Sequence, residues 1–260
     1  MNRTLVVGPA SLRVFDTGSG GPCFVFIHGW ACDHTAWDLQ AADLSRDYRC
    51  LSIDLRGRGG SSLTPPYDTA QQADDVAAVL TELGTGAAIL VGHSLGGITA
   101  LLVNERHPGL VLGVVMGDSP VRASMAGLTA LAESVREANS TEPMRPLLKR
   151  FWHPGTSAEV KRYVLDMMLS CPPEVAAGMV ADAPTNMTEL VKLADQKPFM
   201  AIWAENAIGD PGWLRDVTMF TRQESIPGTG HFFQLEKPAV TNALLRAFLD
   251  DVQRDPRITR

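Results

Sequence analysis

The sequence predicts an α/β protein in which a mostly parallel sheet of eight strands is flanked by helices, with a helical insertion after the sixth strand. Short β-rich runs alternate with helical patterns along most of the 260 residues, which is typical of a parallel sheet covered on both faces. The first runs have no helix between them, so we expect the sheet to begin with an antiparallel edge. A long stretch without a convincing strand interrupts the alternation before the last two runs.

The expected strands are short runs rich in β-branched and aromatic residues, bounded by turn-forming residues. In chain order they are Thr4–Val7, Leu12–Asp16, Cys23–His28, Arg49–Leu55, Ala88–Gly92, Val111–Gly117, Phe199–Trp203 and Thr221–Ile226. Helices are expected over Thr69–Leu83, Ser94–Arg106 and Pro238–Val252, because apolar side chains recur there at helical spacing.

The interrupting stretch runs from about Val121 to Lys197, and its prolines predict several short helices. It predicts a helical cap formed by residues 121–197, inserted into a core formed by residues 1–120 and 198–260. Its methionines, with Phe151 and Trp152, suit an irregular hydrophobic pocket. Each of them is better explained singly as part of the cap's own core, so no cap residue is assigned a substrate contact.

Composition excludes several classes of protein. The net charge of −6, without a cluster of Lys and Arg, argues against a nucleic-acid partner. No run approaches the ~18 apolar residues of a membrane span, and the first residues lack the apolar core of a signal peptide. The four cysteines show no metal-binding or redox spacing, and Cys23 and Cys50 are expected to be buried thiols. We therefore expect a cytoplasmic protein.

The strongest chemical signal is Gly92-His93-Ser94-Leu95-Gly96, at the junction of an expected strand and an expected helix. A serine on such a turn has a strained backbone and an exposed hydroxyl, and side chains two residues to either side would collide. The motif therefore predicts that Ser94 is a nucleophile.

A serine hydroxyl needs a base, and His231 is the best candidate because it lies in a loop between the last expected strand and the last helix. Among the other histidines, His28 is expected to support a loop, and His93 is expected to point away from the open side of the turn. His34, His107 and His153 lie in segments that are typical of the surface or the cap.

With these motifs the chain resembles the α/β-hydrolase fold superfamily, in its serine-nucleophile, cap-bearing branch. The resemblance covers roughly residues 11 to 253 and depends on four motifs in order. They are His28-Gly29-Trp30, Asp54-Leu55-Arg56-Gly57-Arg58-Gly59-Gly60-Ser61, the turn at Ser94, and Gly230-His231. The resemblance implies that the backbone N–H groups of Trp30 and Leu95 form the oxyanion hole, and that Asp54 and Arg56 support loop structure.

The acidic member of the triad departs from the commonest family pattern. Where many relatives carry an aspartate after the penultimate strand, this chain has alanine in the segment Ala204–Ala207. A second family location, after the strand that follows the turn helix, holds Asp118. We therefore predict Asp118 as the acid, with Asp210 and Glu205 as the alternatives.

These residues predict a serine hydrolase that cleaves an ester or related acyl compound without a metal or organic cofactor. The expected partner is a small hydrophobic or aromatic substrate, and no oligomeric state is predicted. Serine at the turn separates the chain from dehalogenases and epoxide hydrolases, which use aspartate.

Alternatives remain open within the resemblance. A cofactor-free dioxygenase acting on hydroxyquinolone rings has a similar Gly29-Trp30 pair followed by Asp33-His34, and an acid at the position of Asp118. C–C bond hydrolases and haloperoxidase-like perhydrolases share the fold. A binding module without catalysis is disfavoured by the presence of the serine, the histidine and both oxyanion segments.

Overall fold

The computed structural model describes residues 1–122, 125–181, 184 and 186–257. Its strands form an eight-stranded sheet in the order β1-β2-β4-β3-β5-β6-β7-β8. Every expected strand is present, within a few residues at each end. The strands are β1 (Asn2–Val7), β2 (Ala10–Thr17), β3 (Phe24–Ile27), β4 (Cys50–Ile53), β5 (Ala88–His93), β6 (Val111–Gly117), β7 (Phe199–Ala204) and β8 (Arg222–Ile226).

The sheet is antiparallel at one edge and parallel elsewhere. β1 pairs with β2, and β2 with β4, in antiparallel register. The two residues between β1 and β2 can form a hairpin but are far too few for the crossover that a parallel pair needs. From β4 onward the neighbours β4-β3-β5-β6-β7-β8 are parallel. This arrangement confirms the predicted mostly parallel sheet with an antiparallel edge.

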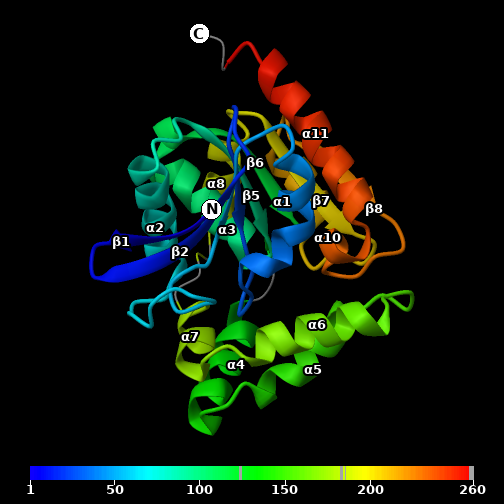
Figure 1. Cartoon of the computed structure of the whole chain (residues 1–260). Helices are drawn as coiled ribbons and strands as arrows, with labels where there is room; N and C mark the ends of the chain where they lie inside the picture. The colour runs from blue at the N-terminus through cyan, green and yellow to red at the C-terminus, as the bar shows by residue number, and fades with distance from the viewer. Residues whose placement is uncertain (123–124, 182–183, 185, 258–260) are drawn as a thin grey trace.

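Helices cover both faces of the sheet (Figure 1). Successive side chains of β3 alternate between two apolar clusters, one on each face of the sheet. Val25 and Ile27 belong to the cluster that includes residues of α2 and α3. Phe24 and Phe26 belong to the cluster that includes residues of α1 and α11. The expected helices correspond to α2 (Thr69–Glu82), α3 (Leu95–Arg106) and α11 (Pro238–Arg254). Shorter helices that were not predicted are α1 (Asp38–Leu44), α9 (Pro211–Val217), α10 (Phe233–Glu236), and the 3₁₀ turns η1 (His34–Trp37) and η2 (Pro108–Leu110).

Several helices follow β6, and most are short, as expected from the prolines, but two of them have 14 and 12 residues. They are α4 (Met125–Ala138), η3 (Glu142–Met144), α5 (Arg145–Leu148), η4 (Lys149–Phe151), α6 (Ala158–Leu169), α7 (Pro173–Gly178) and α8 (Met187–Ala194). Figure 1 shows α4, α5, α6 and α7 grouped beyond one end of the sheet, whereas α8 packs against α3.

The division of the chain at residues 121 and 197 stays a prediction. Positions 123–124, 182–183 and 185 of the predicted cap, and 258–260 of the predicted core, lie outside the described residues.

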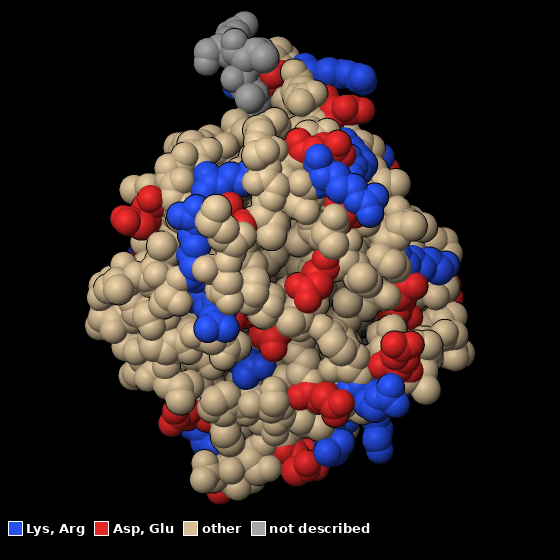
Figure 2. Space-filling model, in the orientation of Figure 1, with Lys and Arg blue, Asp and Glu red and all other residues tan. Residues whose placement is uncertain are grey.

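The surface seen in Figure 2 carries basic and acidic side chains interspersed, with apolar and neutral residues between them. In the part of the chain that the structure describes, every helix is too short or too polar to cross a bilayer. The thiols of Cys23 and Cys50 are buried, as predicted, and burial raises the pKa of each to about 12.

The segment after β4 is fixed by a buried ion pair. Arg56 donates two hydrogen bonds to Asp75 of α2, at 2.8 Å and 2.6 Å, and both side chains are at most 2% exposed. The same guanidinium donates to the backbone carbonyls of Thr64 and Pro65. Arg56 therefore links three segments of the core, as expected for a residue that supports loop structure.

Replacing Asp75 with alanine would leave the guanidinium of Arg56 buried without its counter-charge. We expect Asp75→Ala to lower the free energy of unfolding by about 3–5 kcal/mol, measured by urea denaturation. The exposed pair Glu189–Lys192, at 3.8 Å, provides a matched control, because Glu189→Ala should change stability by about 1 kcal/mol or less. Equal losses from the two substitutions would contradict a structural role for Arg56.

Candidate active site

Ser94 lies on the tight turn between β5 and α3. Its φ of 53° and ψ of −121° are values that non-glycine residues rarely adopt. Its backbone N–H donates a 2.7 Å hydrogen bond to the carbonyl of Gly117, at the end of the neighbouring strand β6. The serine is therefore held in a strained backbone at the carboxyl edge of the sheet, as the sequence predicts.

The flanking glycines are required by backbone contacts at this turn. A Cβ atom on Gly92 would lie 2.2 Å from the carbonyl oxygen of Gly96, and one on Gly96 would lie 2.3 Å from that of Ile27. Both distances are far below van der Waals contact between carbon and oxygen. The spacing of glycines around Ser94 is thus explained by how closely α3 approaches β5 and β3.

His231 and Asp118 form a buried hydrogen-bonded pair. The Nδ1 atom of His231 lies 2.7 Å from Oδ2 of Asp118, and the two side chains are 2% and 0% exposed. The other carboxylate oxygen, Oδ1, accepts a 3.2 Å hydrogen bond from the backbone N–H of Ile208. A buried carboxylate needs such partners. Asp118 directly follows β6 and His231 lies in the loop after β8, so the predicted contact is present and the catalytic roles stay predictions.

The two alternative acids lie elsewhere and bond to other groups. Glu205 is half-exposed, accepts from the backbone N–H of Gly228 at 2.6 Å, and lies 3.6 Å from His153. Asp210 caps α9 by accepting from the N–H of Trp213 at 2.8 Å. Neither has a hydrogen bond to His231 among the described residues.

A second histidine supports the first. The Nε2 atom of His93 lies 2.8 Å from the carbonyl oxygen of His231, and the two rings are 4.4 Å apart. Because a carbonyl only accepts, Nε2 carries the proton. Burial, followed by the nearby charge of His231, holds the pKa of His93 well below its usual value, so His93 is neutral. The His93 side chain is completely buried against the rings of His231 and Phe232, and the expectation that it points away from the open side of the turn stays a prediction.

The loop that carries His231 is also fixed by the segment after β6. The backbone N–H of His231 donates to the carbonyl of Phe151 at 2.8 Å, and the Phe151 ring lies 4.5 Å from the imidazole. The two backbones approach so closely that a Cβ atom on Gly230 would lie 2.2 Å from the same carbonyl oxygen. Phe151 therefore helps to position His231.

Ser94 and His231 line one cavity of about 650 Å³. Trp30 and Leu95 line it too, and neither backbone N–H has an acceptor among the described residues. Leu95 is the first residue of α3, where helical N–H groups have no intrahelical partner. The indole of Trp30 donates to the carbonyl of Ala176 at 2.6 Å, which fixes this wall of the cavity.

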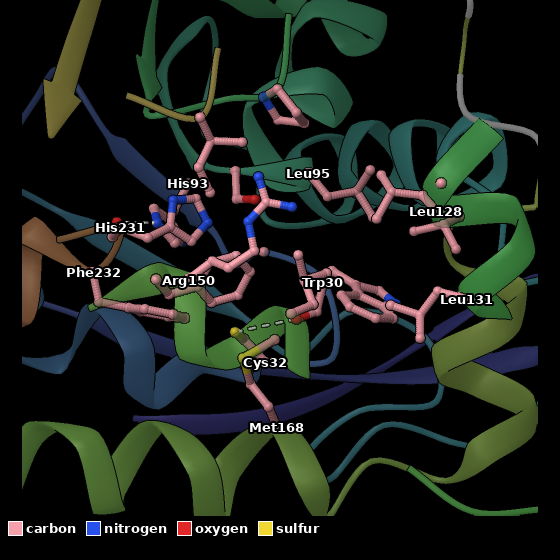
Figure 3. Close-up of a pocket in the computed structure, with 18 of the residues that line it drawn as sticks. Trp30, Cys32, His93, Leu95, Leu128, Leu131, Arg150, Met168, His231 and Phe232 are labelled. Atoms are coloured by element: carbon pink, nitrogen blue, oxygen red, sulfur yellow. Dashed lines mark hydrogen bonds between the residues drawn. The ribbon is translucent and has the colours of Figure 1, made fainter. Parts of the chain in front are cut away.

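The rest of the lining is mostly apolar and comes largely from the helices after β6 (Figure 3). It includes Leu128, Leu131, Leu147, Phe151, Met168 and Val180. Arg150 and Asn206 add polar groups to it. The sequence motifs gave no signal for these residues, because their position depends on how the short helices pack rather than on local spacing.

One group of described residues has ligand atoms close enough to hold a metal ion, namely Asp33, His34 and Asp54. Asp33 accepts hydrogen bonds from the N–H and hydroxyl groups of Thr35. Asp54 accepts from His34 and from the N–H of Gly60. Burial of His34 lowers its pKa, but the hydrogen bond and charge of Asp54 outweigh burial and raise it overall. The hydrogen bond to Asp54 already occupies Nδ1 of His34, and none of the three residues lines the cavity.

The fold and part of the sequence are similar to those of known hydrolases. The chain is 26% identical to an esterase from Thermogutta terrifontis, solved with malate bound; the match covers 97% of this chain and 99% of that one, with a TM-score of 0.86. It is 32% identical to 2-(acetamidomethylene)succinate hydrolase of Mesorhizobium japonicum, over 52% of this chain and 49% of the relative.

A 31% match to an esterase of Mycobacterium tuberculosis covers 50% of this chain and 47% of that protein, so these alignments span about half the length of the two curated relatives. The family model described as "Alpha/beta hydrolase family" matches residues 24–244. The match covers most of the chain, including the turn at Ser94 and the loop of His231, and we conclude that the protein belongs to the alpha/beta hydrolase family.

Proposed function

We propose that the protein is a serine hydrolase that cleaves an ester or related acyl substrate through a Ser94–His231–Asp118 triad. The observation that carries the proposal is the 2.7 Å hydrogen bond between His231 and the buried Asp118, in a site where His231 and the strained Ser94 line the same cavity. Trp30 and Leu95 line it as well, and their backbone N–H groups have no acceptor in the described part of the chain. Together these are the parts that acyl transfer requires.

The mechanism follows from the role of each group. His231, with Nδ1–H held by Asp118, takes the proton of Ser94 through Nε2 as the hydroxyl oxygen attacks the substrate carbonyl. The N–H groups of Trp30 and Leu95 stabilise the negative oxygen that forms. The imidazolium then protonates the departing alcohol, which leaves an acyl group on Ser94. Water, deprotonated by His231, attacks the acyl group and releases the acid.

The relatives support a hydrolytic reaction. One is named as a hydrolase of 2-(acetamidomethylene)succinate, and the others are named as esterases. The apolar lining of the cavity supports a small hydrophobic or aromatic substrate.

The structure does not favour the dioxygenase alternative. Of the residues that carried that resemblance, Gly29 and Trp30 line the cavity and suit either reaction. Asp33, which caps η1, and His34, which is bonded to Asp54, do not line it. The acid at Asp118 is common to both reactions and does not distinguish them.

Ser94→Ala should remove nearly all ester hydrolysis, a loss of about 10³-fold or more, because it removes the hydroxyl oxygen that forms the acyl-enzyme in the proposed mechanism. The assay is release of p-nitrophenol from p-nitrophenyl esters of increasing chain length. A fluorophosphonate probe should label the wild-type protein at Ser94, as located by peptide mass spectrometry. Near wild-type turnover by the variant would exclude the acyl-enzyme mechanism.

Asp118→Asn should reduce kcat strongly, because the amide no longer enforces the imidazole tautomer; the equivalent change costs about 10⁴-fold in a serine-protease triad. Asp210→Asn and Glu205→Gln are matched controls, and each should change kcat/KM by less than about tenfold. Asparagine can still cap α9, so the first control should remain folded. A larger loss in either control than in Asp118→Asn would assign the acid elsewhere.

Hydrolysis and oxygen chemistry differ in their second substrate. Turnover of the best ester under argon should equal turnover in air, because water is the only co-substrate of a hydrolase. A parallel oxygen-electrode assay with 3-hydroxy-4-quinolones should show no consumption. Stoichiometric oxygen uptake with the best substrate would refute the hydrolase proposal while leaving the family assignment intact.

A further inference from the structure

The cavity that contains Ser94 has an uneven distribution of charge. Among the described residues that line it there is no Asp or Glu, and Arg150 is the one side chain with a permanent charge. The other polar side chains of the lining carry no permanent charge, because they are either neutral groups or histidines, which can titrate. A ligand in this cavity therefore meets a single fixed positive charge.

Arg150 also differs from nearby arginines in having unused donors. Arg145 is paired with Glu142, and Arg58 donates to the backbone carbonyls of Cys32 and Met167. Within the described chain, Arg150 has neither an ion-pair partner nor a side-chain hydrogen bond. Figure 3 shows its side chain extending toward the centre of the group of labelled lining residues.

The backbone that carries Arg150 is fixed relative to the catalytic pair. Arg150 lies in the 3₁₀ turn η4 and precedes Phe151. Phe151 accepts the 2.8 Å hydrogen bond from the N–H of His231 and packs against its ring. The guanidinium is thus presented from a segment whose position is tied to the base, which is what a recognition group acting on the reacting substrate requires.

We infer that Arg150 determines specificity by binding an anionic group, a carboxylate, on the substrate whose acyl carbon reacts with Ser94. The planar guanidinium matches the two oxygens of a carboxylate and stays charged at every physiological pH. The leucines of the lining would contact an apolar segment between the carboxylate and the carbonyl. The inferred substrate class is therefore an ester or related acyl compound with one free carboxylate, and the inference rests on the proposed function.

The primary test compares two p-nitrophenyl esters of equal chain length. Mono-p-nitrophenyl glutarate ends in a carboxylate, and p-nitrophenyl valerate ends in a methyl group. The wild-type protein should prefer the charged ester by about tenfold in kcat/KM, since a charge-assisted hydrogen bond at an exposed arginine is worth about this much. The preference should fall as salt is raised.

Substitutions in η4 test whether the preference for the charged ester depends on Arg150. Arg150→Gln should lower kcat/KM for the glutarate ester about tenfold more than for the valerate ester, and Arg150→Lys should restore part of the difference. Lys149→Gln is the matched control, because it removes the same charge one residue away, outside the cavity lining. Equal effects of Lys149→Gln and Arg150→Gln would overturn the inference.

A second ester pair distinguishes where the carboxylate lies. If the valerate ester of 4-(carboxymethyl)phenol is preferred over that of 4-ethylphenol, and the preference depends on Arg150, the anionic group belongs to the alcohol portion. A preference confined to the glutarate ester assigns it to the acyl portion. Both results support an anion site at Arg150, and a lack of preference in both pairs contradicts it.

Binding without turnover separates this inference from the proposed function. Glutarate itself should bind wild-type protein by calorimetry, and Arg150→Gln should weaken this binding about tenfold. If no ester is hydrolysed and Ser94 is not labelled, the hydrolase proposal fails while the glutarate measurement still tests the anion site. If valerate is hydrolysed but glutarate binds both proteins equally, only the assignment of Arg150 fails.

Discussion

The hydrogen bond between His231 and Asp118 is the contact on which the organisation of the site depends. It joins the end of β6 to the loop after β8, across 113 residues of sequence, with both side chains almost completely buried. A carboxylate in such surroundings is tolerated only when its oxygens are bonded. The short helices after β6 contribute to the same arrangement, since Phe151 holds the backbone of His231 from the other side. The sheet, the loop of His231 and the helices after β6 therefore meet at this pair.

The central strands could be predicted because they are covered on both faces. A strand such as β3 buries every residue, so its sequence is a continuous apolar run that is easy to recognise. The order of the strands, with β3 between β4 and β5, depends on pairings between distant segments and left no local signal. The short helices α9 and α10 were missed because two turns or fewer show little periodicity.

The site shows the same difference between features with a local sequence signal and features that depend on contacts between distant segments. Ser94 and Asp118 lie at the carboxyl ends of neighbouring strands, and the residues around each of them report that position. Asp118 was predicted because the chain lacks an aspartate at the commoner place, and its bond to His231 agrees with that interpretation. Arg150 and the contact between His93 and His231 could not be predicted, because both depend on packing between segments far apart in the sequence.

The bond between the N–H of His231 and the carbonyl of Phe151 has a consequence for how substrate enters and product leaves. A rigid movement of η4 away from the sheet would break this bond and pull the aromatic support from the imidazole. Opening of the cavity at that side would therefore remove contacts that hold the proposed base, His231, whereas Leu128 and Leu131 of α4 line the cavity without a described hydrogen bond to His231. The η4 wall and the α4 wall of the cavity therefore differ in one respect, because among the described residues the hydrogen bond to the backbone N–H of His231 comes from the η4 wall.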